Sequence, residues 1–78
     1  MDYSVRHISG KNYQINLIPS SQEEHKLIQN MQLENLEMYY HHAVEQKLGS
    51  SACLLSIINT IDRYSVIGEI EYARGFGS

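Results

Sequence analysis

The sequence has few residues that staple a small fold or anchor it in a membrane. Cys53 is the single cysteine, so no disulfide can form within the chain, and nothing points to an oxidising compartment. No segment approaches the ~18 consecutive apolar residues of a membrane span. Asp2 and Arg6 interrupt the region where a signal peptide needs an apolar run. We therefore expect a cytoplasmic protein with no membrane contact.

Clustered positive charge is also lacking. The six lysines and arginines stand singly along the chain, and the formal net charge is -3. Binding to nucleic acid needs grouped cations that displace counterions from phosphates. We expect DNA or RNA binding to be weak and easily abolished by salt. A small transcriptional regulator that places a helix in a DNA groove is therefore the second, less favoured function.

The apolar content is sufficient for one small core. Hydrophobic residues make up 42% of the 78 residues and charged residues 19%, which is typical of a globular chain. We interpret residues 1–78 as a single domain. A domain of this size buries only about 60% of its unfolded surface and is marginally stable alone. We therefore expect a protein partner, most simply a second copy in a homodimer.

The N-terminal part has the period-two alternation of half-buried strands. Apolar and polar side chains alternate over residues 3–7 and again over residues 13–17, and residues 9–12 between them provide turn chemistry. A two-residue turn would pair apolar with polar side chains, whereas a three-residue loop sets Val5 opposite Ile15. The sequence therefore predicts a β-hairpin in the second register.

Helix boundary signals follow the hairpin. Ser20 or Ser21, each with a glutamate three residues later, provides a capping box. Lys47 followed by Gly49 is typical of a helix C-terminus. We expect helical structure over residues 21–48.

The interior of residues 21–48 carries two apolar sets. At about 100° per residue, Leu27, Ile28 and Met31 lie on one side of a helix. A second set lies roughly opposite and consists of Leu33, Leu36, Tyr40, Ala43 and Val44. Either the segment breaks near residues 30–35 into two helices, or one continuous helix buries its second face against another chain. Both forms have equal support, and the continuous form predicts a dimer built on this helix.

The pattern over residues 51–64 favours a further helix. Ser50 or Ser51 provides a cap, and the apolar residues recur at helical spacing, at Leu54, Ile57, Ile58, Ile61 and Tyr64. A buried strand is the rival interpretation, because isoleucine is β-branched and the run is nearly continuous. We take the helix as the prediction.

The end of the chain completes the predicted fold. Alternation from Val66 to Tyr72 predicts a final strand, and residues 74–78 are expected to form a mobile tail. The sequence thus predicts an α+β fold. Its small antiparallel sheet, the N-terminal hairpin plus the C-terminal strand, is covered on one face by two or three helices.

Reactive side chains do not fall into catalytic or metal-binding patterns. Histidines occur four times, at His7, His25, His41 and His42. His41 and Glu45 form an i,i+4 pair that could share an ion, but a tetrahedral site needs further ligands and no paired-ligand motif is present. Cys53 is expected in the core rather than as a nucleophile. We expect no catalytic residue, no metal and no cofactor.

Two further features have structural explanations. Residues 49–51 precede the expected third helix, where backbone amides can hold an anion, but helix capping accounts for the glycine and serines there. Glu69 and Glu71 share one face of the last strand. We expect them on a solvated outer face rather than as a catalytic pair.

The strongest functional signal is a candidate partner surface on the helical segment. Tyr39 and Tyr40 are neighbours and cannot both face one core, and tyrosine is enriched at interface hot spots. The predicted surface comprises Leu27, Ile28, Met31, Met38, Tyr39 and His42. We expect a non-enzymatic protein-binding module. Small phage- or mobile-element-encoded inhibitors and adaptors of larger proteins are of this kind.

Overall fold

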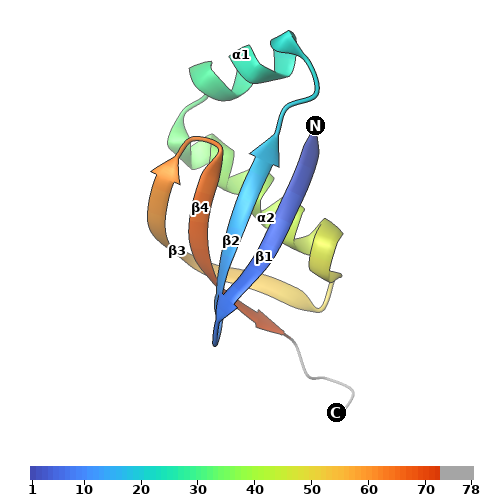
Figure 1. Cartoon of the computed structure of the whole chain (residues 1–78), viewed down its shortest axis with the longest axis vertical. Coiled ribbons are helices and arrows are strands. Elements are labelled where there is room, and N and C mark those ends of the chain that lie inside the picture. The colour runs from blue at the N-terminus through green and yellow to red at the C-terminus, as the bar shows by residue number, and fades with distance from the viewer. Residues whose placement is uncertain (73–78) are drawn as a thin grey trace.

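The predicted α+β class is confirmed by a computed structural model, which describes residues 1–72. The elements in chain order are β1 (Asp2–Ser9), β2 (Asn12–Ile18), α1 (Gln22–Asn30), α2 (Leu33–Leu48), β3 (Ala52–Asp62) and β4 (Ser65–Tyr72). The four strands form one antiparallel sheet in the order β1-β2-β4-β3, so β1 and β3 are its edges. α2 crosses one face of the sheet diagonally, and α1 lies beyond one end of it (Figure 1). The predicted mobile tail, residues 74–78, lies outside the described residues.

The N-terminal hairpin has the predicted register. Val5 pairs with Ile15, as expected. The structure reaches this register by a different route, because Ser9 pairs with Asn12 across a two-residue turn and Ile8 is the extra residue of a bulge. The bulge shifts the pairing by one residue, as the predicted three-residue loop would have done, and so keeps the apolar side chains opposite one another.

The helical segment is broken into two helices. The side chain of Ser21 caps α1 by accepting a hydrogen bond from the backbone N–H of Glu24 at 3.2 Å, as the capping box predicts. Met31 and Gln32 are extended, and α2 begins after them. At the far end Gly49 takes φ 95° and donates its N–H to the carbonyl of Glu45, which confirms the predicted C-cap.

The break between the helices changes how the first apolar set, Leu27, Ile28 and Met31, is covered. Because the chain turns at residues 31–32, Ile28 reaches the core and is 0% exposed. Leu27 stays 46% exposed, and Met31 is half-buried. The case for a dimer built on one continuous helix therefore loses its premise, since the same chain already covers Ile28.

The predicted helix over residues 51–64 is wrong, because most of this segment forms β3. β3 pairs antiparallel with β4 and carries three bulges, whose extra residues are Leu55, Ile58 and Ile61. Each bulge inserts one residue between inward-facing positions, so Leu54 and Ile57, which both pack on the core, stand three residues apart. This spacing imitates the i, i+3 repeat of a helix. The β-branched residues were the signal of the true structure.

The core lies between the sheet and the helices. Its fully buried large side chains are Ile15, Ile28, Leu36, Val44, Val66 and Ile70. Gly68 on β4 lets β3 pack closely, because a Cβ there would lie 2.5 Å from Leu54 Cδ1. Any side chain at this position would therefore require Leu54 to move.

A row of polar side chains lies on the sheet face away from α2. Arg6 donates a hydrogen bond to Gln14 at 2.9 Å, Gln14 donates to Ser65 at 3.0 Å, and Ser65 donates to Asn16 at 2.7 Å. Arg6, Gln14 and Asn16 alternate with the inward-facing residues of their strands and so lie on the opposite face, where Ser65, 9% exposed, joins them. This face presents hydrogen-bonding groups to the surroundings.

Glu71 extends the polar character toward the edge of the hairpin, where it forms an ion pair with Lys11 at 3.3 Å. Both side chains are more than half exposed, at 58% for Lys11 and 51% for Glu71, which agrees with the predicted solvated outer position.

Neither of the helices in residues 1–72 is long and apolar enough to cross a membrane.

Candidate protein-binding groove

An open groove of about 560 Å³ lies between the start of β1 and one flank of α2. β1 contributes one residue to its lining, the helix break one, and α2 four: Tyr3, Met31, Asn35, Met38, Tyr39 and His42. Two methionines and two tyrosines dominate this set, and it contains no lysine, arginine, aspartate or glutamate. The groove is therefore largely apolar, with an amide, an imidazole and phenolic hydroxyls as its polar groups.

Helical spacing places the four α2 residues together. Asn35, Met38, Tyr39 and His42 stand at i, i+3, i+4 and i+7 and share one face of α2. The buried face lies further round the helix and consists of Leu36, Tyr40, Ala43 and Val44. α2 thus has one face covered by the sheet and a second one open to the groove. Met38, at 71%, is the most exposed large apolar side chain in residues 1–72.

The two adjacent tyrosines point to different environments. Tyr40 is 2% exposed, and its hydroxyl donates a hydrogen bond to the backbone carbonyl of Arg63 at 2.5 Å. Burial, and then the charge of Asp62, raise the pKa of Tyr40 to about 12, so the hydroxyl keeps its proton and its role as a donor. Tyr39 is half-buried and lines the groove. Core packing therefore uses one tyrosine and leaves the other for contact.

Tyr3 joins the two walls of the groove. Its ring meets that of His42 edge to face, with centroids 5.5 Å apart and planes at 75°, a favourable aromatic geometry. Burial, followed by the proximity of Tyr39 and of Glu24, raises the pKa of Tyr3. The Tyr3 hydroxyl therefore stays protonated at neutral pH and can donate a hydrogen bond to a bound group.

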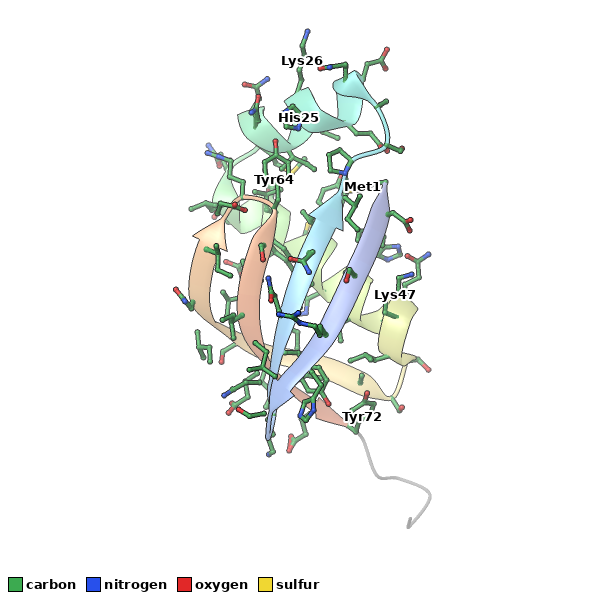
Figure 2. The ribbon with its side chains drawn as sticks, in the orientation of Figure 1. Met1, His25, Lys26, Lys47, Tyr64 and Tyr72 are labelled. Atoms are coloured by element: carbon green, nitrogen blue, oxygen red, sulfur yellow. The ribbon has the colours of Figure 1, made fainter. Side chains whose placement is uncertain are left out.

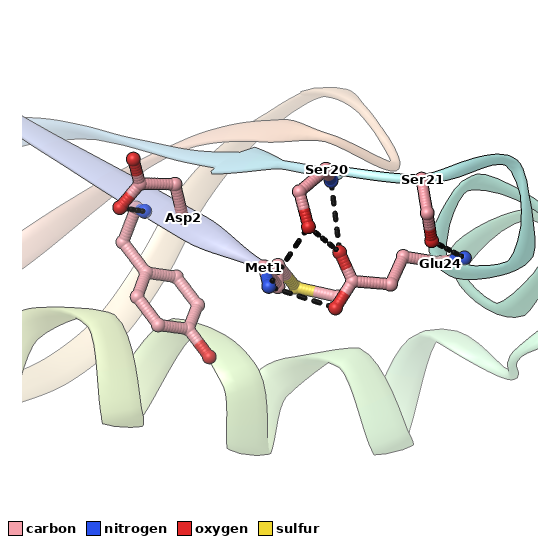
Figure 3. A network of polar contacts seen from close by, with 6 residues as sticks. Met1, Asp2, Ser20, Ser21 and Glu24 are labelled. Carbon is pink, nitrogen blue, oxygen red and sulfur yellow. Dashed lines mark hydrogen bonds and ion pairs between the residues drawn. The ribbon is translucent and has the colours of Figure 1, made fainter.

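A polar network holds the start of β1 against the beginning of α1 (Figure 3). The Glu24 carboxylate accepts hydrogen bonds from the Met1 ammonium at 2.7 Å and from the backbone N–H and the hydroxyl of Ser20 at 2.8 and 2.6 Å. The hydrogen bond from the ammonium, and then those from Ser20, lower the pKa of Glu24 to about 2. The network fixes the end of β1 that carries Tyr3 into the groove.

The turn between β3 and β4 holds the helix break. The Arg63 guanidinium donates hydrogen bonds to the carbonyls of Met31 and of Ile28, the latter at 3.4 Å. It thereby gives the Met31 carbonyl a charged donor and adds a second donor to the Ile28 carbonyl, which also accepts the backbone N–H of Met31. Next to it, Tyr64 stacks on His25 with ring centroids 5.2 Å apart and forms a hydrogen bond with His25 Nδ1 at 2.9 Å (Figure 2). These contacts keep Met31 at the end of the groove.

Sequence reasoning missed Arg63 and Tyr64 for a physical reason. Arg63 contacts carbonyls 32 and 35 residues away, and Tyr64 contacts a histidine 39 residues away. No local spacing encodes such contacts. The one available signal was an arginine directly after Asp62 in a segment otherwise free of charge, which fits a turn better than a helix interior.

The structure brings together four of the predicted partner-binding residues. Met31, Met38, Tyr39 and His42 line the groove. Leu27 is exposed on α1, outside the groove lining, and lies with Glu23 and Glu24 near the helix N-terminus. Ile28 is corrected, because a side chain that is 0% exposed cannot touch a partner. Sequence reasoning did not select Tyr3 or Asn35, which complete the lining.

The other reactive groups are separate from the groove, apart from His42. Within residues 1–72, no three His, Cys, Asp or Glu side chains gather as metal ligands. His7 contacts the carbonyl of Gly10 at 2.8 Å in the hairpin turn. Cys53 is exposed on β3, so its predicted core position is wrong: the neighbouring Leu54 takes the inward position of the strand. Residues 49–51 lead into a strand, which removes the helix N-terminus that an anion site there required.

Comparisons of the chain with models of protein families, with curated proteins and with solved structures gave no match. The chemistry of the groove and of the exposed surfaces therefore carries the functional argument.

Proposed function

We propose that the protein is a non-enzymatic binding module that holds an apolar segment of a larger protein in the groove between β1 and α2. The observation that carries this proposal is the lining itself, in which exposed Met38 stands beside Met31 and Tyr39. Methionine side chains are flexible and polarisable and adapt to different apolar surfaces. Tyrosine supplies contact area at a low cost in conformational entropy.

The groove suits a protein segment better than a nucleic acid. A nucleic-acid site needs lysine or arginine against phosphates, and the lining contains neither. The polar groups that are present, such as Asn35 and the Tyr3 hydroxyl, match the backbone amides of a peptide. The transcriptional regulator is therefore the weaker candidate.

A catalytic role has less support than a binding role. The polar side-chain atoms that line the groove belong to Tyr3, Asn35, Tyr39 and His42. A single imidazole with no carboxylate or nucleophile in the lining does not form an acid/base pair. The size of the chain and its binding surface are compatible with a small inhibitor or adaptor of the phage or mobile-element kind. The single cysteine is consistent with action in the cytoplasm.

Site-specific cross-linking tests the proposal. A photo-reactive amino acid at Met38, in cells that produce the protein, should capture one protein, identified by mass spectrometry. The matched control carries the same group at Glu37, which is exposed on α2 but does not line the groove. The captured protein is then purified and titrated with the unmodified chain and with Met38→Asp.

The titration decides between specific and incidental capture. Met38→Asp should weaken binding more than about tenfold, because a carboxylate must be desolvated in an apolar contact. Glu37→Ala should leave the affinity unchanged. Equal binding by all three chains, or cross-links from Met38 to nucleic acid alone, would refute the groove as a protein site.

A further inference from the structure

The second edge of the sheet carries an apolar surface that the groove does not use. Leu55, Ile58 and Ile61 are 48, 55 and 53% exposed, and together they form the β3 strip. Each is the extra residue of a bulge and has no Cα partner on β4. No lysine, arginine, aspartate or glutamate occurs from Ala52 to Ile61. Three large apolar side chains are thus exposed on an edge strand that carries no charge before Asp62.

The bulges determine how this edge can be covered. A regular edge strand pairs with another strand through its backbone, but each bulge interrupts the ladder and increases the twist. With three bulges in 11 residues, β3 cannot offer a long regular ladder. Contact must therefore use side chains, and it does not extend the sheet into an open-ended fibre.

The spacing of the strip is self-complementary. Ile58 has one apolar neighbour three residues before it and one three residues after it. Two antiparallel copies related by a two-fold axis near Ile58 would place Leu55 of each copy against Ile61 of the other. A two-fold contact requires this correspondence, in which the same patch serves both chains.

Charge also favours a second copy. The chain has a net charge of -3, and two copies repel wherever their acidic residues meet. α1 carries Glu23 and Glu24 in its first turn and α2 carries Glu34 in its own, whereas the β3 strip has no charge. Asp62 directly follows the strip and Glu69 and Glu71 lie on the neighbouring β4, but the strip residues themselves bring no like charges together when two strips meet. The strip also has no charge to select a partner of opposite sign.

We propose that the β3 strip binds a second copy of the chain, forming a homodimer around a two-fold axis near Ile58. The proposal is independent of the proposed function, because the groove includes β1, at the opposite edge of the sheet. Both grooves remain open in such a dimer. The dimer presents two identical partner sites, which increases the effective affinity for a partner with repeated segments.

Sedimentation of the unmodified chain and two variants tests the dimer. The unmodified chain should form a dimer at tens of micromolar. Ile58→Glu places two carboxylates near the axis and should raise the dissociation constant at least about 100-fold. Met38→Glu introduces the same charge in the groove and should leave the dimer intact.

A disulfide experiment tests the register without relying on a charged variant. In a Cys53→Ser background, Ile58→Cys should form a linked dimer rapidly under mild oxidation, because the residue faces its own copy. Leu55→Cys alone should link slowly, and a mixture of Leu55→Cys with Ile61→Cys should link rapidly. A monomer at a few hundred micromolar, an intact Ile58→Glu dimer, or a dimer that Met38→Glu dissociates would each overturn the proposal.

Discussion

The two edge strands of the sheet differ in regularity and in charge. β1 pairs with β2 without interruption from Asp2 to His7 and carries the charged residues Asp2 and Arg6. β3 shifts its register three times along 11 residues and carries no charge before Asp62. An unprotected edge invites indiscriminate strand pairing, and charge and bulges are alternative protections. The comparison indicates that bulges allow β3 to expose apolar residues that a regular edge strand would have to replace.

The two edges also differ in the polar contacts that connect them to α1. Near β1, the Glu24 carboxylate binds Met1 and Ser20. Near the end of β3, Arg63 in the following turn binds the carbonyls at the end of α1. The contacts near β1 depend on pH through a carboxylate, whereas a guanidinium stays charged at every pH at which the fold exists. The two sides of the molecule should therefore respond differently to acid.

The largest effect is expected within β3. Leu54 is 4% exposed and Leu55 is 48% exposed. Leu54→Ala should lower the free energy of unfolding by ~2–5 kcal/mol, and Leu55→Ala by less than ~0.5 kcal/mol at concentrations where the chain is monomeric. Urea denaturation measures both. Equal losses at the two positions would contradict the bulged strand.

A smaller loss is expected for the close approach of β3 and β4. In Gly68→Ala, the new Cβ would lie 2.5 Å from Leu54 Cδ1 and 3.2 Å from the Ser56 carbonyl oxygen, and overpacking of this kind costs ~1–3 kcal/mol. Glu69→Ala on the same strand is the control and should be nearly neutral. Thermal melts of the two variants make the comparison. A Gly68→Ala variant as stable as the unmodified chain would show that the Leu54 side chain or β3 moves aside without cost.

The hydrogen bonds from Arg63 to the end of α1 should contribute less to the free energy of unfolding. Arg63→Ala leaves carbonyls at the end of α1 without their charged donor, which should cost ~1–2 kcal/mol, discounted because the arginine is only half-buried. In the variant, the amide hydrogens of α1 should exchange faster than in the unmodified chain, and those of α2 should change less. The same variant should weaken the groove, since Met31 loses its support. Unchanged exchange in α1 would indicate that packing of Ile28 alone holds the helix.

The smallest effect is expected from protonation of Glu24, which weakens its contacts with Met1 and Ser20 at low pH. The pKa of Glu24 is lowered from 4.5 to about 2, so its stabilising contribution is complete above pH 4.5 and is lost as the pH falls toward 2. Glu24→Gln lacks the contribution of the charged carboxylate. Its stability deficit relative to the unmodified chain should therefore shrink as the pH falls over that range. Melting temperatures of the two chains between pH 4.5 and pH 2 measure it. A deficit that is constant across the range would show that Glu24 acts by its shape and not its charge.

The parts of the fold that could be predicted are those set by neighbouring residues. Ser21 and Gly49 mark helix ends because caps act within one turn. The pairing of Val5 with Ile15 followed from the requirement that apolar side chains share a face. β3 was mispredicted because its bulges change the apolar period from two toward three, and a period of three does not distinguish a bulged strand from a helix.

The candidate site was only partly predictable. Met38, Tyr39 and His42 follow from helical spacing on α2. Tyr3 and Ile28 could not be assigned, because their roles depend on how β1 lies beside α2 and on where the helical segment breaks. Sequence spacing ranks positions within one element, and packing between elements decides which of them remain exposed.

The central claim is that the groove and the β3 strip are separate surfaces with separate partners. A dilution series followed by two-dimensional NMR of the amide signals tests it most directly. We expect the signals of Leu55, Ile58 and Ile61 to shift with protein concentration, while those of Met31, Met38 and Tyr39 stay in place. Concentration-dependent shifts centred on Met31, Met38 and Tyr39 would contradict it, because the groove would then be the site of self-association.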